Sequence, residues 1–163
     1  DWPVSWRLVA VQEVIVISLE TVRMGRILSI DYGVRRTGLA VTDPLQIIAN
    51  GLTTVNTPQL IAFLQDYLSR EHVERFVVGL PKQTNGRDSD NLPRVKAFVK
   101  KLGQTFPAVP IEMWDERYTS VMAHHAMLES GIGKKARQNK ALVDEISACI
   151  ILQGWMESRQ HHL

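Results

Sequence analysis

Apolar residues fall in short runs over the first half of the chain, and this pattern predicts strands. Two β-rich runs, Arg26–Asp31 and Gly38–Thr42, are joined by a short loop that contains glycine, which predicts a hairpin. A third run, Ile47–Val55, extends the hairpin into a meander. Glu74–Leu80 and Val109–Trp114 are short apolar runs that predict two further strands.

Between and after these runs, apolar residues recur at the spacing of an α-helix. Thr57-Pro58, a cap residue followed by proline, opens the first predicted helix, with an apolar stripe at Leu60, Leu64, Tyr67 and Leu68. A second helix is expected at about residues 91–102, with Leu92, Val95, Val99 and Leu102 on one face. Two further helices are expected at about residues 120–130 and 139–158. The order β-β-β-α-β-α-β-α-α predicts an α/β fold. We expect a mixed five-stranded sheet, an antiparallel three-strand meander plus two parallel strands, with helices on both faces.

Polar residues stand where three of these strands end. Asp31 ends the first strand, Gly79-Leu80-Pro81 the fourth, and Asp115-Glu116 the fifth. If these strands are parallel neighbours, their carboxyl ends lie along one edge, which is the usual place for a ligand. Alternatively, Asp31 is an ordinary turn carboxylate and Glu116 an acid at the start of a helix.

The composition is that of an ordinary globular protein. The chain of 163 residues is 45% hydrophobic and 22% charged, which suits a single domain. The net charge of +2 is small, but Gly133–Lys140 holds four cations and no acid. Cys149 is the only cysteine and has apolar neighbours, which favours a reducing compartment such as the cytoplasm and an inert, buried thiol.

The first 23 residues do not share the pattern of the rest. They have neither the features of a secretion signal nor the length of apolar sequence that spans a bilayer. We expect residues 1–23 to be an extension and residues 24–163 to form the domain. The alternative is an additional edge strand at Glu13–Leu19.

The last predicted helix is apolar nearly all round and yet contains two acids, Asp144 and Glu145. A buried carboxylate needs a cation, either a metal ion or a basic side chain such as Lys140, four residues earlier. Periodicity alone does not decide which acid faces the sheet.

Acids from three distant segments, without a His cluster or paired cysteines, form the oxygen-rich ligand set that Mg²⁺ or Mn²⁺ prefers. Two such ions can serve phosphodiester hydrolysis.

Four motifs in order, IDYGVRRTGLAV, VVGLPKQTNGRDSD, WDERYTS and KALVDEISACIIL, resemble those of the YqgF family. The likeness covers Arg26 to about Met156. It implies an RNase H-like nuclease, described for the family as one that matures the 5′ end of pre-16S rRNA in ribosome biogenesis or as a Holliday-junction resolvase. By position, it implies Asp31, Glu116 and Asp144 as catalytic residues and as ligands of two Mg²⁺ or Mn²⁺ ions.

Charge and placement suggest six cations for contact with the nucleic acid backbone: Lys82, Arg117, Lys134, Lys135, Arg137 and Lys140. A merely solvated basic loop is the alternative for the lysines, and Arg117 could instead orient a carboxylate. The expected partner is a structured RNA precursor or branched DNA, with no membrane involved. A homodimer would suit symmetric cleavage of a junction.

Two other classes of protein fit parts of the sequence. Actin-like and sugar-kinase ATPases also use an Asp-x-Gly hairpin, but the chain shows no second such hairpin and no GK[ST] motif. A non-catalytic nucleic-acid-binding module would need only the scaffold and the basic loop.

Overall fold

The computed structural model describes residues 25–81, 91–115 and 139–160, which contain a five-stranded sheet in the order β3-β2-β1-β4-β5. The strands are β1 (Arg26–Asp31), β2 (Arg36–Thr42), β3 (Ala49–Asn56), β4 (Val73–Leu80) and β5 (Ile111–Asp115). β1 pairs antiparallel with β2 and β2 with β3, whereas β4 lies parallel to both β1 and β5. The predicted meander with two parallel strands is therefore confirmed.

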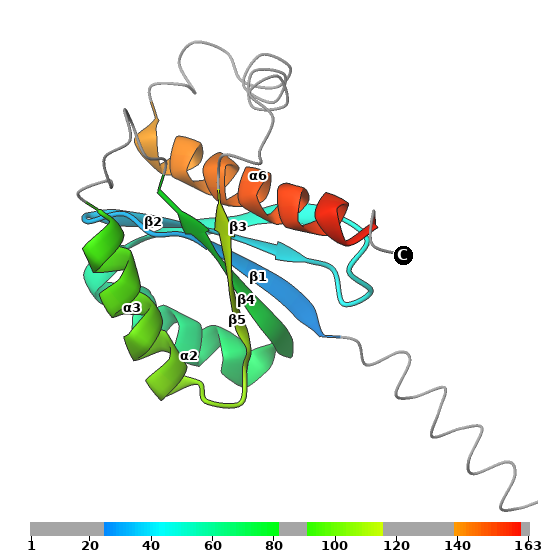
Figure 1. Ribbon diagram of the computed structural model, residues 1–163, viewed down its shortest axis with the longest axis horizontal. Coiled ribbons are helices and arrows are strands. Elements are labelled where there is room, and N and C mark those ends of the chain that lie inside the picture. Colours follow the sequence, from blue (N-terminus) through cyan, green and yellow to red (C-terminus); the bar gives the residue numbers. More distant parts are fainter. Residues whose placement is uncertain (1–24, 82–90, 116–138, 161–163) are drawn as a thin grey trace, which may run out of the picture.

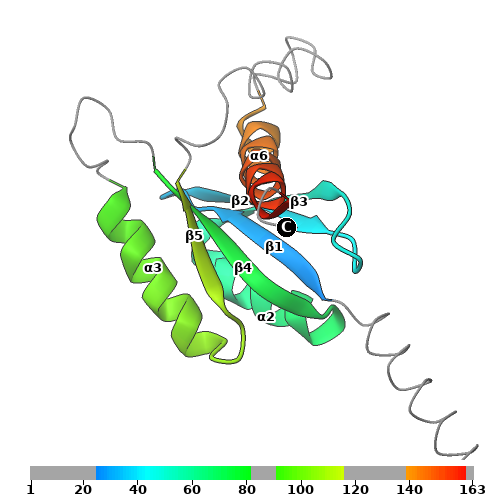
Figure 2. The ribbon, with the colours of Figure 1, turned by 45° about the vertical axis from the view of Figure 1, so that its right-hand side comes forward.

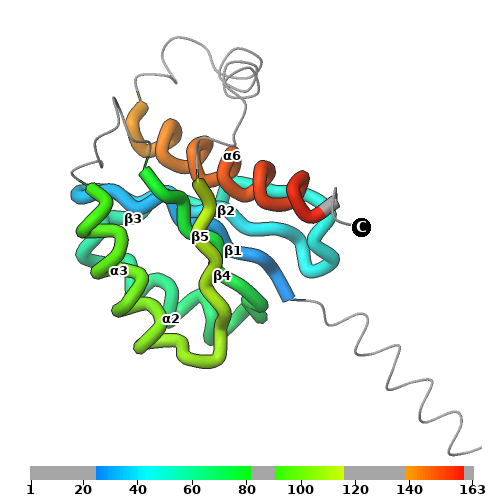
Figure 3. Tube along the Cα trace, in the orientation of Figure 1, coloured from blue at the N-terminus to red at the C-terminus, as the bar shows by residue number. Residues whose placement is uncertain are grey.

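Helices cover both faces of this sheet, as expected. The short helix η1 (Thr57–Gln59) leads into α2 (Leu60–Arg70); the other described helices are α3 (Leu92–Thr105) and α6 (Lys140–Gln160). Figures 1 and 2 show α2 and α3 on one face and α6 crossing the other. The tube in Figure 3 shows the same arrangement of the chain.

Side-chain alternation divides the interior into two apolar clusters, because neighbouring residues of a strand point to opposite faces. Leu28 and Ile30 of β1 belong to the larger cluster, under α2 and α3. Ile27 belongs to the smaller cluster, which it shares with Ile151 and Trp155 of α6. This alternation tells on which face each strand residue lies.

Two local details differ from the sequence prediction. Thr57 does not cap the helix with its side chain; its hydroxyl instead donates to the Gly33 carbonyl at 2.6 Å. Phe98, absent from the predicted apolar stripe of α3, is buried together with Val95 and Leu102. A ring at this position extends the core beyond the aliphatic residues of the stripe.

Several expectations fall outside the described residues. These are the extension at residues 1–23, the helix at about 120–130, Glu116, Lys82, Arg117, Lys134, Lys135 and Arg137. In the part that is described, no helix combines the length and the apolar character needed to cross a membrane.

Candidate active site at the carboxyl edge of the sheet

Asp31 is the last residue of β1, the central strand of the sheet. Ile27 packs under α6, and Ser29 donates its hydroxyl to the Ala148 carbonyl of α6 at 2.7 Å. Since residues two apart in a strand share a face, Asp31 lies on the α6 face, at the carboxyl edge. The carboxylate is partly buried there.

Gly38 brings the second acid to this place. It is the register partner of Asp31 on β2, and paired residues share a face about 5 Å apart between Cα atoms. A Cβ at Gly38 would collide with the backbone carbonyl of Asp144. The missing side chain thus lets α6 pass directly over the strand next to Asp31. The structure brings Asp31 and Asp144 together from positions far apart in the sequence.

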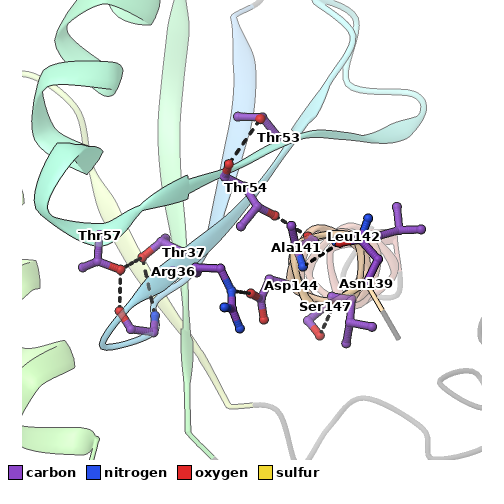
Figure 4. A network of polar contacts seen from close by, with 12 residues as sticks. Arg36, Thr37, Thr53, Thr54, Thr57, Asn139, Ala141, Leu142, Asp144 and Ser147 are labelled. Carbon is purple, nitrogen blue, oxygen red and sulfur yellow. Dashed lines mark hydrogen bonds and ion pairs between the residues drawn. The ribbon is translucent and has the colours of Figure 1, made fainter. Parts of the chain in front are cut away.

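Arg36 holds the Asp144 carboxylate. Its Nε donates to Oδ2 of Asp144 at 3.1 Å, and both side chains are partly exposed (Figure 4). The sequence offered Lys140 as one basic partner, but the contact comes from the first residue of β2, while Lys140 is exposed at the start of α6. Sequence reasoning did not assign Arg36 a role, although its position in the turn after Asp31 was a usable signal.

The neighbouring acid, Glu145, lies over a different strand. A Cβ at Gly51 of β3 would collide with the Glu145 carboxylate, and β3 is two strands away from β1. Periodicity left the choice between Asp144 and Glu145 open; the packing of α6 puts Asp144, rather than Glu145, beside the strand that pairs with Asp31.

Polar contacts fix the start of α6 on the sheet (Figure 4). Asn139 accepts hydrogen bonds from the amides of Ala141 and Leu142 at 3.1 and 3.4 Å, and these satisfy otherwise unpaired groups of the first turn. The hydroxyl of Thr54 on β3 donates to the Ala141 carbonyl. Asp144, one turn further on, is therefore held in place by its backbone as well as by Arg36.

β5 ends at the same edge, where Asp115 is the register partner of Leu80. Ile111 and Met113 pack on the larger cluster, and alternation puts Asp115 on their face, away from α6. Trp114 packs with the α6 cluster. Within the described ranges, no three His, Cys, Asp or Glu side chains form a group that could hold a metal ion; Glu116 is outside those ranges.

Cys149 is set apart from this chemistry. It is half-buried on α6, and burial, with a smaller contribution from the charge of Glu145, raises the pKa of its thiol to about 11. At neutral pH the thiol therefore carries its proton and is a poor nucleophile. This agrees with its predicted inert role.

Residues 25–158 match the family model RuvX, described as Holliday junction resolvase. The chain belongs to the RuvX family. The resemblance to YqgF, another name for this family, is confirmed.

Two bacterial relatives match this chain over nearly their full length. A protein of Phocaeicola vulgatus is 59% identical over 138 residues, 85% of this chain and 99% of the relative. One of Porphyromonas gingivalis is 58% identical over 135 residues, 83% of this chain and 98% of the relative. Both carry the name "Putative pre-16S rRNA nuclease".

The fold of this chain resembles that of a solved structure, "T. thermophilus RuvC in complex with Holliday junction substrate". Its TM-score is 0.53 at 19% identity, covering 82% of this chain and 96% of that one. A second structure of Thermus thermophilus RuvC gives 0.52 at the same identity. The fold is thus the RNase H-like α/β fold that the sequence predicted.

Proposed function

We propose that this chain, a nuclease of the RuvX family, hydrolyses phosphodiester bonds in a precursor of 16S rRNA with the acids at its carboxyl edge. The observation that carries the proposal is the close approach of α6 over Gly38, which brings Asp144 beside Asp31. The names of the relatives that the chain matches over 82–86% of its length support the RNA substrate.

The third acid of the proposal is Glu116. It is proposed from its position in the family motif WDERYTS, and it lies outside the described residues. Its neighbour Asp115 is described, and alternation along β5 puts Asp115 on the face of Met113, away from α6. Asp115 is therefore the less suitable acid.

The donor chemistry fits a divalent cation. Asp31 and Asp144 supply hard carboxylate oxygens from two elements that meet at Gly38, the donor type that Mg²⁺ and Mn²⁺ take. Two such ions, when bound, supply an activated water and stabilise the leaving oxygen. Asp31, Asp144 and Glu116 would hold them, and Arg36 would orient the Asp144 carboxylate toward the site.

Cations would hold the substrate backbone beside these acids. Lys140 is exposed at the start of α6, one turn before Asp144, a position that suits a phosphate contact. The remaining candidates, proposed from charge and sequence position alone, are Lys82, Arg117, Lys134, Lys135 and Arg137. We place this nucleic acid chemistry in the cytoplasm.

A four-way DNA junction is the second candidate substrate, favoured by the description of the matching family. Cleavage of both sides of a junction would call for a homodimer with two acid clusters.

One experiment separates the two substrates and tests the acids. Pre-16S rRNA and a four-way DNA junction are incubated with the chain and with Asp31→Asn under one Mg²⁺ titration. We expect Mg²⁺-dependent cleavage of the RNA, at least about a hundredfold slower in Asp31→Asn, with an unchanged circular dichroism spectrum. An undiminished rate in Asp31→Asn would remove Asp31 from the mechanism. Binding that persists in EDTA, with no cleavage of either substrate, would favour a non-catalytic module.

α6 offers a matched pair for the same assay. Asp144→Asn and Glu145→Gln each remove one carboxylate charge from adjacent positions of one helix. Since Glu145 lies over Gly51 and Asp144 beside Arg36 and Gly38, only Asp144→Asn should lower the rate strongly and raise the Mg²⁺ concentration that is needed. Equal effects of the two variants would contradict the assignment.

A further inference from the structure

A groove of about 460 Å³ opens on the face of the sheet opposite to α6. The turn after β1, the start of α2 and the exposed side of α3 form its walls. The residues that matter here are Tyr32, Val34, Thr57, Arg94, Phe98 and Lys101. No residue of the candidate acid cluster lines it.

The groove is joined rigidly to the acids. Tyr32 follows Asp31 directly, and its carbonyl accepts a hydrogen bond from the Asn91 side chain, before α3, at 3.0 Å. On the other wall, the Thr57 hydroxyl donates to the Gly33 carbonyl at 2.6 Å, and the Thr57 amide donates to the Arg35 carbonyl at 3.0 Å. Both walls therefore hold the turn that carries Asp31, so a ligand in the groove would have a defined position relative to the acids.

The groove is basic on one side. Arg94 and Lys101 line it, and none of its lining residues is an acid. α3 carries two more exposed cations, Lys96 and Lys100, and no acid. Among residues 25–81, 91–115 and 139–160, no ion pair engages any of these four side chains. The charge is thus available to an anion.

The inner surface of the groove is apolar and aromatic. The Tyr32 ring stacks on Phe98 with centroids 4.7 Å apart, and Val34 stays 53% exposed beside them. Bases stack on such aromatic surfaces without regard to sequence, while cations along the groove hold the phosphates. An apolar floor with two cations matches an amphipathic anion better than a small inorganic one.

We propose that this groove binds one nucleotide of a single-stranded RNA segment next to the cleaved bond, with its base against Tyr32 and Val34 and its phosphates at Arg94 and Lys101. The volume is within the range of small-ligand pockets and suits a single nucleotide. The proposal deepens the proposed function and rests on it for the identity of the strand. An RNA strand that passes from Asp31 across the edge of the sheet meets the groove at Tyr32, the residue after Asp31.

The binding test uses the full chain in EDTA and a fluorescein-labelled ten-nucleotide oligo(A) RNA. The double variant Arg94→Ala, Lys101→Ala is compared with a control double variant, Lys96→Ala, Lys100→Ala. The control removes the same charge from the same helix at positions outside the groove. We expect the first pair to weaken binding about tenfold and to reduce the salt slope by about 1.4, with a change in affinity below about threefold for the control pair. Ala97→Glu, which adds a carboxylate to the exposed groove lining, should match the first pair.

Equal weakening of RNA binding by the Arg94/Lys101 variant and by the Lys96/Lys100 control would overturn the proposal, because the helix would then act only through its overall charge. Competition by a poly-glutamate peptide as effective as that by unlabelled RNA would overturn the nucleotide as occupant.

The cleavage test separates this proposal from the proposed function. Two versions of the pre-16S rRNA 5′ region are used, with and without single-stranded nucleotides beside the cleaved bond. In Arg94→Ala with Lys101→Ala, kcat/KM should fall about tenfold only for the version with the single strand. If the wild-type chain cleaves neither RNA, the proposed function fails while the oligo(A) measurement still decides the groove. If the wild-type chain cleaves both and the variant cleaves both equally well, the groove proposal alone fails.

Discussion

The strand residues of the sheet are smaller on the α6 face than on the other face. Under α2 and α3 the buried strand residues are mostly large, among them Phe76, Leu28 and Ile30. Under α6 the strands present four small residues beside the larger Ile27 and Val77: Gly38, Gly51, Ser29 and Ala40. These small residues leave room for the backbone of α6 to come close to the strands.

This difference explains why the acids are on the α6 face. Small residues let the backbone of α6 come against the strands, so that Asp144 lies beside Gly38, the register partner of Asp31. Larger residues at these positions would hold the helix away. The face under α2 and α3 holds the larger apolar cluster, whereas the α6 face also fixes the positions of polar groups. Four sets of variants test this division of roles.

Matched leucines give the largest expected effects. Leu64 of α2 and Leu152 of α6 are both fully buried, one on each face. Replacement of either by alanine should cost about 2–5 kcal/mol in the free energy of unfolding, measured by urea denaturation. At a temperature where both variants are folded, only Leu152→Ala should lower kcat, because it loosens the helix that carries Asp144. An equal loss of kcat in Leu64→Ala would show that the faces are not separable.

Replacing a glycine by alanine should change the free energy of unfolding in opposite directions on the two faces. Gly38→Ala adds a methyl group where the Asp144 carbonyl lies and should cost about 1–3 kcal/mol of stability together with much of the nuclease rate. Gly103→Ala in α3 would meet only the Ile111 side chain at 3.6 Å and should stabilise the chain by roughly 0.5–1 kcal/mol. Thermal unfolding and the RNA cleavage assay measure both; a tolerated Gly38→Ala would disprove the close-approach argument.

Arg36→Gln should have a smaller effect. The Arg36–Asp144 pair is partly exposed, so its loss should cost about 0–1 kcal/mol. Without the guanidinium, the acids at the edge repel each other more, and added Mg²⁺ should raise Tm by more than it does in the wild type. Arg70→Gln, which breaks the exposed pair with Asp66 on α2, is the control and should leave the Mg²⁺ response unchanged.

Cys149 should give the smallest effect at neutral pH. Burial raises the pKa of its thiol from 9.0 to about 11, so the folded state disfavours the thiolate. Its contribution to stability is therefore fully present below about pH 9 and is lost as the pH rises through about 11. Cys149→Ala should leave cleavage at pH 7 unchanged and flatten the fall of Tm between these pH values. An equally steep fall in Cys149→Ala would assign the loss to other groups.

Most of the sheet could be predicted from the sequence because each strand has a recognisable local pattern of residues. The apolar runs and the turn residues between them mark β1 to β5 to within a few residues, and the order of elements implies the parallel carboxyl ends. Phe98 and the role of Thr57 were missed since both depend on neighbours that lie far away in the sequence. The same holds for Arg36, whose acid is 108 positions further along.

Local patterns of the chain determined its strands, its helices and the family motifs that contain Asp31, Glu116 and Asp144. Only the tertiary structure decided that Asp144, and not Glu145, lies beside the strand that pairs with Asp31, because the rotation of α6 depends on its contacts with Gly38 and Gly51. It alone assembled the groove from the β1–β2 turn, α2 and α3. Periodicity reports which residues of one element share a face; the surface that this face meets is set by packing between elements.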